Sequence, residues 1–196
     1  MKINLFIAAV PSHDNRQLIA QKIHQCEAKR SSQIRINWTY LTDLHVTMGF
    51  LSGVETNDAQ ALAQGFTILK DTTKFLATVK DVRIYGNAIV LRLEPYQTFL
   101  GLFKKLKNQL QTVLDNKYHF KEHARFDAHL TIGRIQSPRV LNTTQQYQLT
   151  AMISEQFVNA SFLIQQTALM QRIPENIAKM SKSAQVYQVL QGYPFK

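Results

Sequence analysis

The chain has little cysteine, few acidic residues and no long apolar segment. Its single cysteine, Cys26, excludes an internal disulfide and is compatible with a reducing compartment. The amino-terminal apolar run, residues 5–10, is too short for the core of a signal peptide, and no run in the sequence reaches membrane length. The sequence therefore predicts a cytoplasmic protein that has no membrane partner.

The composition indicates an ordinary globular protein with a basic surface. Hydrophobic residues make up 45% of the chain and charged residues 18%, which is typical of a chain that folds around a core. Only 13 acidic residues oppose 23 lysines and arginines, so the formal net charge is +10. This excess favours a nucleic-acid or phosphate-bearing partner over a surface that is basic only for solubility.

One short pattern of histidine, threonine and glycine occurs twice. Residues 45–50 read His-Val-Thr-Met-Gly-Phe, and residues 129–134 read His-Leu-Thr-Ile-Gly-Arg. Both copies alternate between polar and apolar residues, as a strand with one buried face does. The alternation predicts that the histidine, threonine and glycine of each copy share one face, and that the intervening residues and Phe50 face the core.

The residue types of this repeat suit phosphoryl transfer. A histidine titrates near neutrality, so one of His45 and His129 can remove a proton while the other donates one. Thr47 and Thr131 can hydrogen-bond phosphate oxygens from the same face, and the following glycine leaves room for a ligand. A single His-x-Thr tripeptide is common, whereas two copies with matching glycines favour a shared function. Such a site requires no metal, and the pattern does not distinguish the base from the acid.

These residues resemble the motifs of the 2H phosphoesterases, most closely those of the LigT-like bacterial RNA 2′,3′-cyclic phosphodiesterases, also called 2′-5′ RNA ligases. The first copy fits the family form His-x-Thr-x-x-Phe, and the second fits His-x-Thr-x-x-Arg. The likeness extends to residues 5–11, Tyr187 and residues 193–195, and so covers nearly the whole chain. The resemblance implies a monomer without a cofactor that hydrolyses an RNA terminal 2′,3′-cyclic phosphate to a 2′-phosphomonoester. It assigns proton transfer to His45 and His129 and phosphate binding to Thr47, Thr131 and Arg134.

Two other functions stay open at this point. Cleavage or joining of 2′-5′ linkages in RNA would use the same histidines and threonines, and a non-catalytic RNA-binding relative would need none of them. The two intact motifs argue against the non-catalytic alternative. The place of Arg134 is also open, because strict alternation puts it on the face opposite His129 unless the strand ends or bulges. On that opposite face it would support the interface between the lobes.

The rest of the chain predicts one domain, residues 1–196, in which strands dominate. Helices are expected from about residue 12 to 30, from 56 and from 95 to 115, with a loop or short helix at 142–150. Trp38 is expected to pack in the core rather than to stack on a base. The order of elements predicts an α+β fold with two pseudo-symmetric lobes, each an antiparallel sheet with helices outside. The resemblance implies a LigT-like bilobal fold, with the two motif strands facing each other across a central cleft.

Residues 117–125 form the densest basic stretch and are equally suited to line a phosphate-binding cleft or to form a charged loop. Within this stretch His119, Glu122 and His123 match the zinc motif His-x-x-Glu-His. That motif needs a helix and a distant third ligand, whereas this segment is expected to run from a helix end into a strand. The sequence therefore predicts no metal site here.

Overall fold

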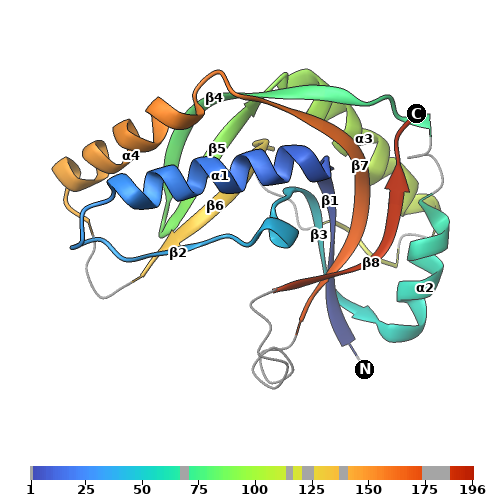
Figure 1. Ribbon diagram of the computed structural model, residues 1–196. Helices are drawn as coiled ribbons and strands as arrows, with labels where there is room; N and C mark the ends of the chain where they lie inside the picture. The colour runs from blue at the N-terminus through green and yellow to red at the C-terminus, as the bar shows by residue number, and fades with distance from the viewer. Residues whose placement is uncertain (1, 67–70, 114–116, 121–125, 137–140, 174–185) are drawn as a thin grey trace.

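The structure, a computed structural model, describes residues 2–66, 71–113, 117–120, 126–136, 141–173 and 186–196. Helices are interspersed among antiparallel strands along these residues, in agreement with the expected α+β class (Figure 1). None of the helices in these residues is long and apolar enough to cross a membrane. In chain order the elements are β1 (Lys2–Pro11), α1 (His13–Lys29), β2 (Ile36–Trp38), the 3₁₀ turn η1 (Leu41–Asp43), β3 (Val46–Glu55), α2 (Thr56–Gly65), β4 (Phe75–Tyr85), β5 (Ala88–Glu94), α3 (Tyr96–Val113), β6 (His129–Ile135), α4 (Thr143–Phe157), β7 (Ser161–Arg172) and β8 (Tyr187–Pro194).

The strands form two antiparallel groups that we call the terminal lobe and the central lobe. The terminal lobe contains β1, β3, β7 and β8, and the central lobe contains β2, β4, β5 and β6 (Figure 1). The neighbours run in the order β1-β3-β6-β5-β4-β7-β8, β2 pairs with β6, and β1 also pairs with β7. This arrangement confirms the predicted α+β fold with two lobes built on antiparallel strands.

The two lobes are joined through two short stretches of strand pairing. At one junction, residues 75–78 of β4 pair with residues 161–164 of β7. At the other, β3 and β6 share a single antiparallel pair, Val46 with Leu130. The two motif strands therefore belong to different lobes and touch where the lobes meet.

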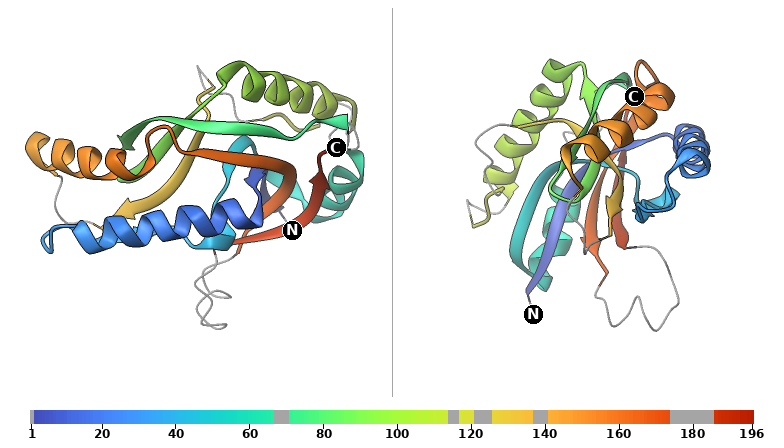
Figure 2. Two further views of the ribbon diagram at one scale, coloured as in Figure 1. Left: turned by 45° about the horizontal axis from the view of Figure 1, so that its top comes forward. Right: turned by 90° about the vertical axis from the view of Figure 1, so that its left-hand side faces the viewer.

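Helices α1 and α4 begin at residues whose side chains cap them, and every helix buries one face. Ser12 caps α1, where its Oγ accepts a hydrogen bond from the Asn15 amide at 3.2 Å. Cys26 lies on the buried face of α1. Helices α1 and α4 lie side by side, and α2 and α3 form a second pair (Figure 2).

Helix α4 replaces the loop or short helix predicted at residues 142–150. Asn142 and Gln145 form a reciprocal capping box, in which each side chain accepts from the other's backbone N–H. The residues that α4 buries, Leu149, Ile153 and Phe157, recur every four positions. These contacts stabilise a helix of 15 residues, although its sequence is rich in polar side chains.

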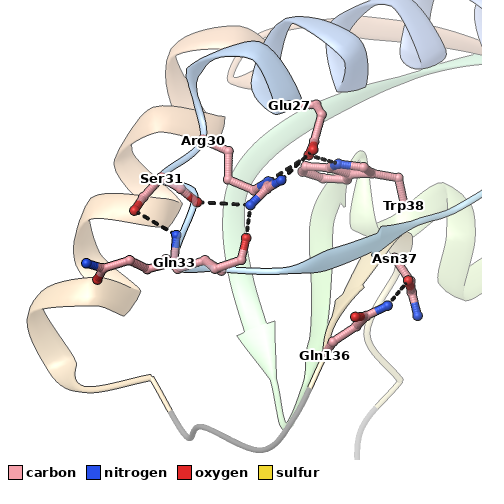
Figure 3. Close-up of polar contacts among 8 residues, drawn as sticks. Glu27, Arg30, Ser31, Gln33, Asn37, Trp38 and Gln136 are labelled. Carbon is pink, nitrogen blue, oxygen red and sulfur yellow. Dashed lines mark hydrogen bonds and ion pairs between the residues drawn. The ribbon is translucent and has the colours of Figure 1, made fainter.

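Trp38 closes the short strand β2, and its indole is held by helix α1 (Figure 3). The indole Nε1 donates a hydrogen bond to Glu27 Oε2 at 2.6 Å. The Arg30 guanidinium donates two hydrogen bonds to the same carboxylate, at 2.6 and 2.8 Å. These hydrogen bonds, first that from Arg30, hold the pKa of Glu27 at about 2. Trp38 packs against the main core, which confirms the packing role predicted for it.

Both motif strands contain a β-bulge at the same place in the motif. Along β3, Thr47 pairs with Ala8 but Gly49 pairs with the adjacent Ile7, so β3 has one extra residue there. Along β6, Thr131 pairs with Val90 and Gly133 with the adjacent Ile89. Each bulge shifts the alternation by one residue, immediately after the motif threonine.

The bulges overturn the predicted role of the two motif glycines. Both glycines turn to the core instead of sharing the face of the histidines. A Cβ on Gly49 would lie 2.6 Å from the Phe120 ring, and one on Gly133 would lie 2.9 Å from Trp38 and Ile36. The glycines therefore make room for core side chains, and not for a ligand as expected from strict alternation.

This close packing predicts opposite effects for two glycine-to-alanine changes. Gly49→Ala should destabilise the protein by roughly 1–3 kcal/mol, because the added methyl overlaps the Phe120 ring. Gly101→Ala should stabilise it by roughly 0.5–1 kcal/mol, because Gly101 lies in α3 with open space where the methyl would go. Urea unfolding of the two variants measures both values. Equal stability of the two variants would contradict the close packing at Gly49.

Candidate active site

The histidines and threonines of the two motifs gather around the pair that joins β3 to β6. Val46 and Leu130 are both completely buried, so the residues on either side of them project from the opposite face. Because the strands run antiparallel, His45 lies on the side of Thr131, and Thr47 lies on the side of His129. Thr47 is exposed and the other three are partly buried. The structure thus brings together the four residues that sequence analysis selected.

Both histidines are oriented by the same kind of backbone hydrogen bond. His45 Nδ1 lies 2.6 Å from the carbonyl oxygen of Asp43, and His129 Nδ1 lies 2.9 Å from that of Asp127. A carbonyl oxygen can only accept, so Nδ1 carries the hydrogen in both rings. Nε2 is then the nitrogen of each imidazole that can exchange a proton with a ligand.

His45 sits in an aromatic environment provided by the terminal lobe. Its ring centroid lies 4.9 Å from that of Phe6 and 5.1 Å from that of Tyr187, whose ring meets it edge-on at 87°. Burial lowers the pKa of His45 to about 4, with a smaller contribution from the charge of His129 and an opposing one from the Asp43 carbonyl.

The low pKa of His45 predicts a specific loss of stability in acid. Between the ordinary pKa of 6.5 and about 4, the unfolded chain binds a proton that folded His45 does not. Stability should therefore fall as the pH drops through this window, by an amount on the order of 1–3 kcal/mol. Urea unfolding at pH 7 and at pH 4.5 should show this loss in the wild type and a smaller one in His45→Asn. An identical pH dependence of the two proteins would contradict the low pKa.

Two aspartates that sequence analysis missed support the histidines with their carboxylates as well as their carbonyls. The buried carboxylate of Asp43 accepts hydrogen bonds from the amides of Val186 and Tyr187 at 2.9 and 3.2 Å, and so ties η1 to the start of β8. Burial raises the pKa of Asp43 in spite of these bonds. The carboxylate of Asp127 accepts from the Tyr85 hydroxyl at 2.6 Å. Both aspartates precede their histidine by two residues, and this shared offset is visible in the sequence.

The bulges bring the last residue of each motif onto the face of the histidines. Arg134 pairs with Ala88, whereas Thr131 and His129 pair with Val90 and Arg92, which alternate with Ala88 on one face of β5. Arg134 is exposed, and its Nη1 donates to the side chain of Asn87 at 3.3 Å. Arg134 therefore lies on the face of His129, the position that the sequence analysis expected only if the strand bulges.

Phe50 is the residue of β3 that corresponds to Arg134. It pairs with Phe6 and packs in a small cluster with Phe6, Ala8 and Val10, which is separate from the main core. The prediction that Phe50 faces the main core is wrong, because the bulge turns its side chain to the face of His45 and Thr47.

Most of the basic stretch, and with it most of the segment that matches the zinc motif, lies outside the described residues. His119 is described, whereas Glu122, His123 and Arg125 are not. Lys117, also described, makes an ion pair with Asp58 at 2.6 Å. The residues that the structure describes contain no group of three or more histidines, cysteines or acidic residues placed to hold a metal ion.

A family model described as the 2′-5′ RNA ligase superfamily matches residues 11–175. The chain belongs to this superfamily. The match includes both His-x-Thr motifs. No curated protein sequence matches the chain significantly.

Solved structures share the fold along the whole chain at low sequence identity. LigT of E. coli in complex with 3′-AMP has a TM-score of 0.67 and 18% identity, over 100% of this chain and 99% of that one. A structure described as a phosphoesterase has a TM-score of 0.69 and 16% identity, over 100% and 99% of the two chains. A Thermus thermophilus protein has a TM-score of 0.65 and 17% identity, over 98% and 97%. These likenesses show the LigT-like fold.

Proposed function

We propose that the protein hydrolyses the terminal 2′,3′-cyclic phosphate of RNA to a 2′-phosphomonoester. The observation that carries the proposal is the convergence of two histidines, each held through Nδ1 by a backbone carbonyl, and two threonine hydroxyls at the junction of β3 and β6. The net charge of +10 suits a polyanionic substrate. E. coli LigT, which shares this fold, has been solved with 3′-AMP, phosphate, ATP and NADP⁺.

In the proposed reaction the two imidazoles act as base and acid. Nε2 of one histidine removes a proton from water, and the water oxygen forms a new bond to phosphorus. Nε2–H of the other histidine gives its proton to the ribose 3′ oxygen as the bond from phosphorus to that oxygen breaks. The products are a 2′-phosphate and a free 3′-hydroxyl, and the proton taken from water restores the charge of the pair.

The charge that develops on phosphate requires fixed donors. The hydroxyls of Thr47 and Thr131 donate to the non-bridging oxygens, since they share the face of the histidines. Arg134 lies further along that face of β6 and contributes a cation to the phosphate. The histidine pair supplies both proton transfers, so this mechanism requires neither a metal nor a cofactor.

A substrate panel tests the proposed reaction. It contains RNAs that end in a 2′,3′-cyclic phosphate and oligonucleotides with 2′-5′ linkages, each assayed with EDTA present. We expect turnover of the cyclic phosphates, with a 2′-phosphate as the product and no loss of rate in EDTA. Preferred turnover of the 2′-5′ linkages would favour the alternative reaction on the same residues. Binding of both RNAs without turnover of either would identify a non-catalytic relative.

Inorganic phosphate and sulfate should inhibit this reaction competitively, because the proposed site binds an anion even without RNA. The rate should be bell-shaped in pH, since the pair must carry one proton to act, and its limbs report the coupled pair. Steady-state kinetics with added phosphate checks the mode of inhibition, and the rate measured over a range of pH checks the bell shape. Non-competitive inhibition would place the anion elsewhere.

We further propose that residues 1–196 act as one domain and as a cytoplasmic monomer. Light scattering of the purified protein tests the oligomeric state.

A further inference from the structure

A pocket of about 310 Å³ lies in the central lobe, next to His129. Its volume is at the lower end of the range for small-molecule sites, roughly 300–1,000 Å³. The walls combine aromatic rings with charged side chains, chiefly Tyr85, Tyr96, Phe126, Lys80, Arg92 and Asp127. Its position and its composition both bear on what binds there.

Two of the lining residues contact His129, and a third pairs with it across the strands. The ring of Tyr85 meets the imidazole edge-on at 79°, with the centroids 5.7 Å apart. Asp127 accepts the His129 Nδ1 hydrogen on its carbonyl oxygen, and Arg92 is the cross-strand partner of His129 on β5. A group in this pocket is therefore within reach of the phosphate that His129 and Thr131 would hold.

The aromatic walls are fixed in place by the neighbouring helix. Phe126 stacks on Phe103 of α3, with the ring centroids 5.0 Å apart and the planes at 18°. Tyr96, the first residue of α3, lies 6.4 Å from Phe126 with the ring planes tilted by 41°. Both rings are partly exposed, so each presents aromatic surface to the pocket. Such surfaces bind flat heterocycles by stacking.

The polar groups of the pocket carry both signs of charge. Lys80 and Arg92 are cationic, and each makes an ion pair: Lys80 with Glu94 at 2.6 Å and Arg92 with Asp81 at 3.0 Å. The carboxylate of Asp127 and the hydroxyls of Tyr85 and Tyr96 add further acceptors and donors. A nucleobase has a flat face and an edge with both donors and acceptors, and so it matches this mixture better than a second phosphate does.

We propose that this pocket binds a second nucleobase of the RNA, joined to the nucleotide whose phosphate lies between the two motifs. The inference rests on the proposed function for the identity of that phosphate. The second base belongs either to the nucleotide that precedes the terminal one or to the nucleoside on the far side of a 2′-5′ linkage. Both sources present the same chemistry to Tyr96 and Phe126, and the experiment below separates them.

The test compares the affinities of three ligands by isothermal titration calorimetry. They are a nucleoside 2′-phosphate, a dinucleotide that ends in a 2′-phosphate, and a 2′-5′-linked dinucleotide with a slowly hydrolysed phosphorothioate. We expect at least one dinucleotide to bind about tenfold more tightly than the mononucleotide, because it adds one stacked base. The dinucleotide that shows the gain identifies the source of the second base.

Variants of Tyr96 assign this gain to the pocket. Tyr96→Ala should reduce the affinity ratio to near one, whereas Tyr96→Phe, which keeps the ring, should retain it. Lys104→Ala is the matched control, because Lys104 is an exposed residue of the same helix outside the pocket. Equal affinities of all three ligands for the wild type, or an unchanged ratio in Tyr96→Ala, would overturn the proposal.

Turnover measured on the same preparations separates this proposal from the proposed function. A Tyr96-dependent gain without turnover of cyclic phosphates would support the pocket and refute the proposed reaction. Turnover without any gain from the second base would support the reaction and refute the base-binding pocket.

Discussion

Replacing either His45 or His129 with alanine is expected to lower the turnover of a 2′,3′-cyclic phosphate by roughly 10²–10⁴-fold. Each ring is held through Nδ1 by a backbone carbonyl, so only its Nε2 can exchange a proton with the substrate. Alanine removes that nitrogen and leaves the other histidine without a partner for the opposite proton transfer. The double variant should be little worse than either single one, because the two groups act as a unit.

The same variants should remain folded, which circular dichroism and urea unfolding check. His24→Ala serves as the matched control, since His24 is an exposed histidine of α1, and it should keep the wild-type rate. Near-normal turnover in either His45→Ala or His129→Ala would refute the paired acid–base mechanism. A large loss in His24→Ala would show instead that the assay responds to any loss of a histidine.

The local pattern predicted the faces of the motif strands correctly up to the residue before each glycine, since Met48 and Ile132 are buried in the core as expected. His45 and Thr47 project opposite the buried Val46, as strict alternation requires. The alternation then fails at both glycines, because each strand bulges where core side chains fill the space that a Cβ would take. Phe120 and Trp38, which fill that space, are distant in sequence from the glycines they contact. The alternation within each motif therefore cannot reveal them.

The supporting residues of the histidines differ in how far the sequence reveals them. The aspartates recur at one offset, so comparison of the two copies from Asp43 and Asp127 onward would have found them. The edge-on tyrosines have no such signal, since Tyr85 comes from β4 and Tyr187 from β8. Only the pairing of the strands brings them to the rings, and tertiary contacts of this kind are invisible to a local pattern.

The regular elements were predictable wherever their own side chains determine them. Helices α1 and α3 lie close to the predicted residues 12–30 and 95–115. Strand β2, in contrast, has three residues and depends on pairing with β6, so its sequence alone gives no period to detect. The length of helix α4 was underestimated, although the sequence shows its capping box at Asn142 and Gln145.

Replacing Thr47 or Thr131 with valine is expected to lower kcat by roughly 10²–10³-fold, the usual effect of removing one oxyanion donor. Valine keeps the branched shape that suits a strand and removes only the hydroxyl. Since the donors act on charge that develops in the transition state, kcat should fall more than KM rises. Thr47 is exposed and Thr131 is partly exposed, so the change should leave stability nearly unaffected.

Serine at the same positions distinguishes the hydroxyl from the rest of the side chain. Thr47→Ser and Thr131→Ser should recover most of the rate, because the donor returns without the methyl group. Thr144→Val, at an exposed threonine of α4, should turn over substrate like the wild type. Inhibition by inorganic phosphate provides a second readout, since the loss of a phosphate-binding hydroxyl should also weaken the competitive anion. Valine variants that keep the wild-type kcat would show that the threonines do not contact the phosphate, and the site would then retain only its pair of histidines.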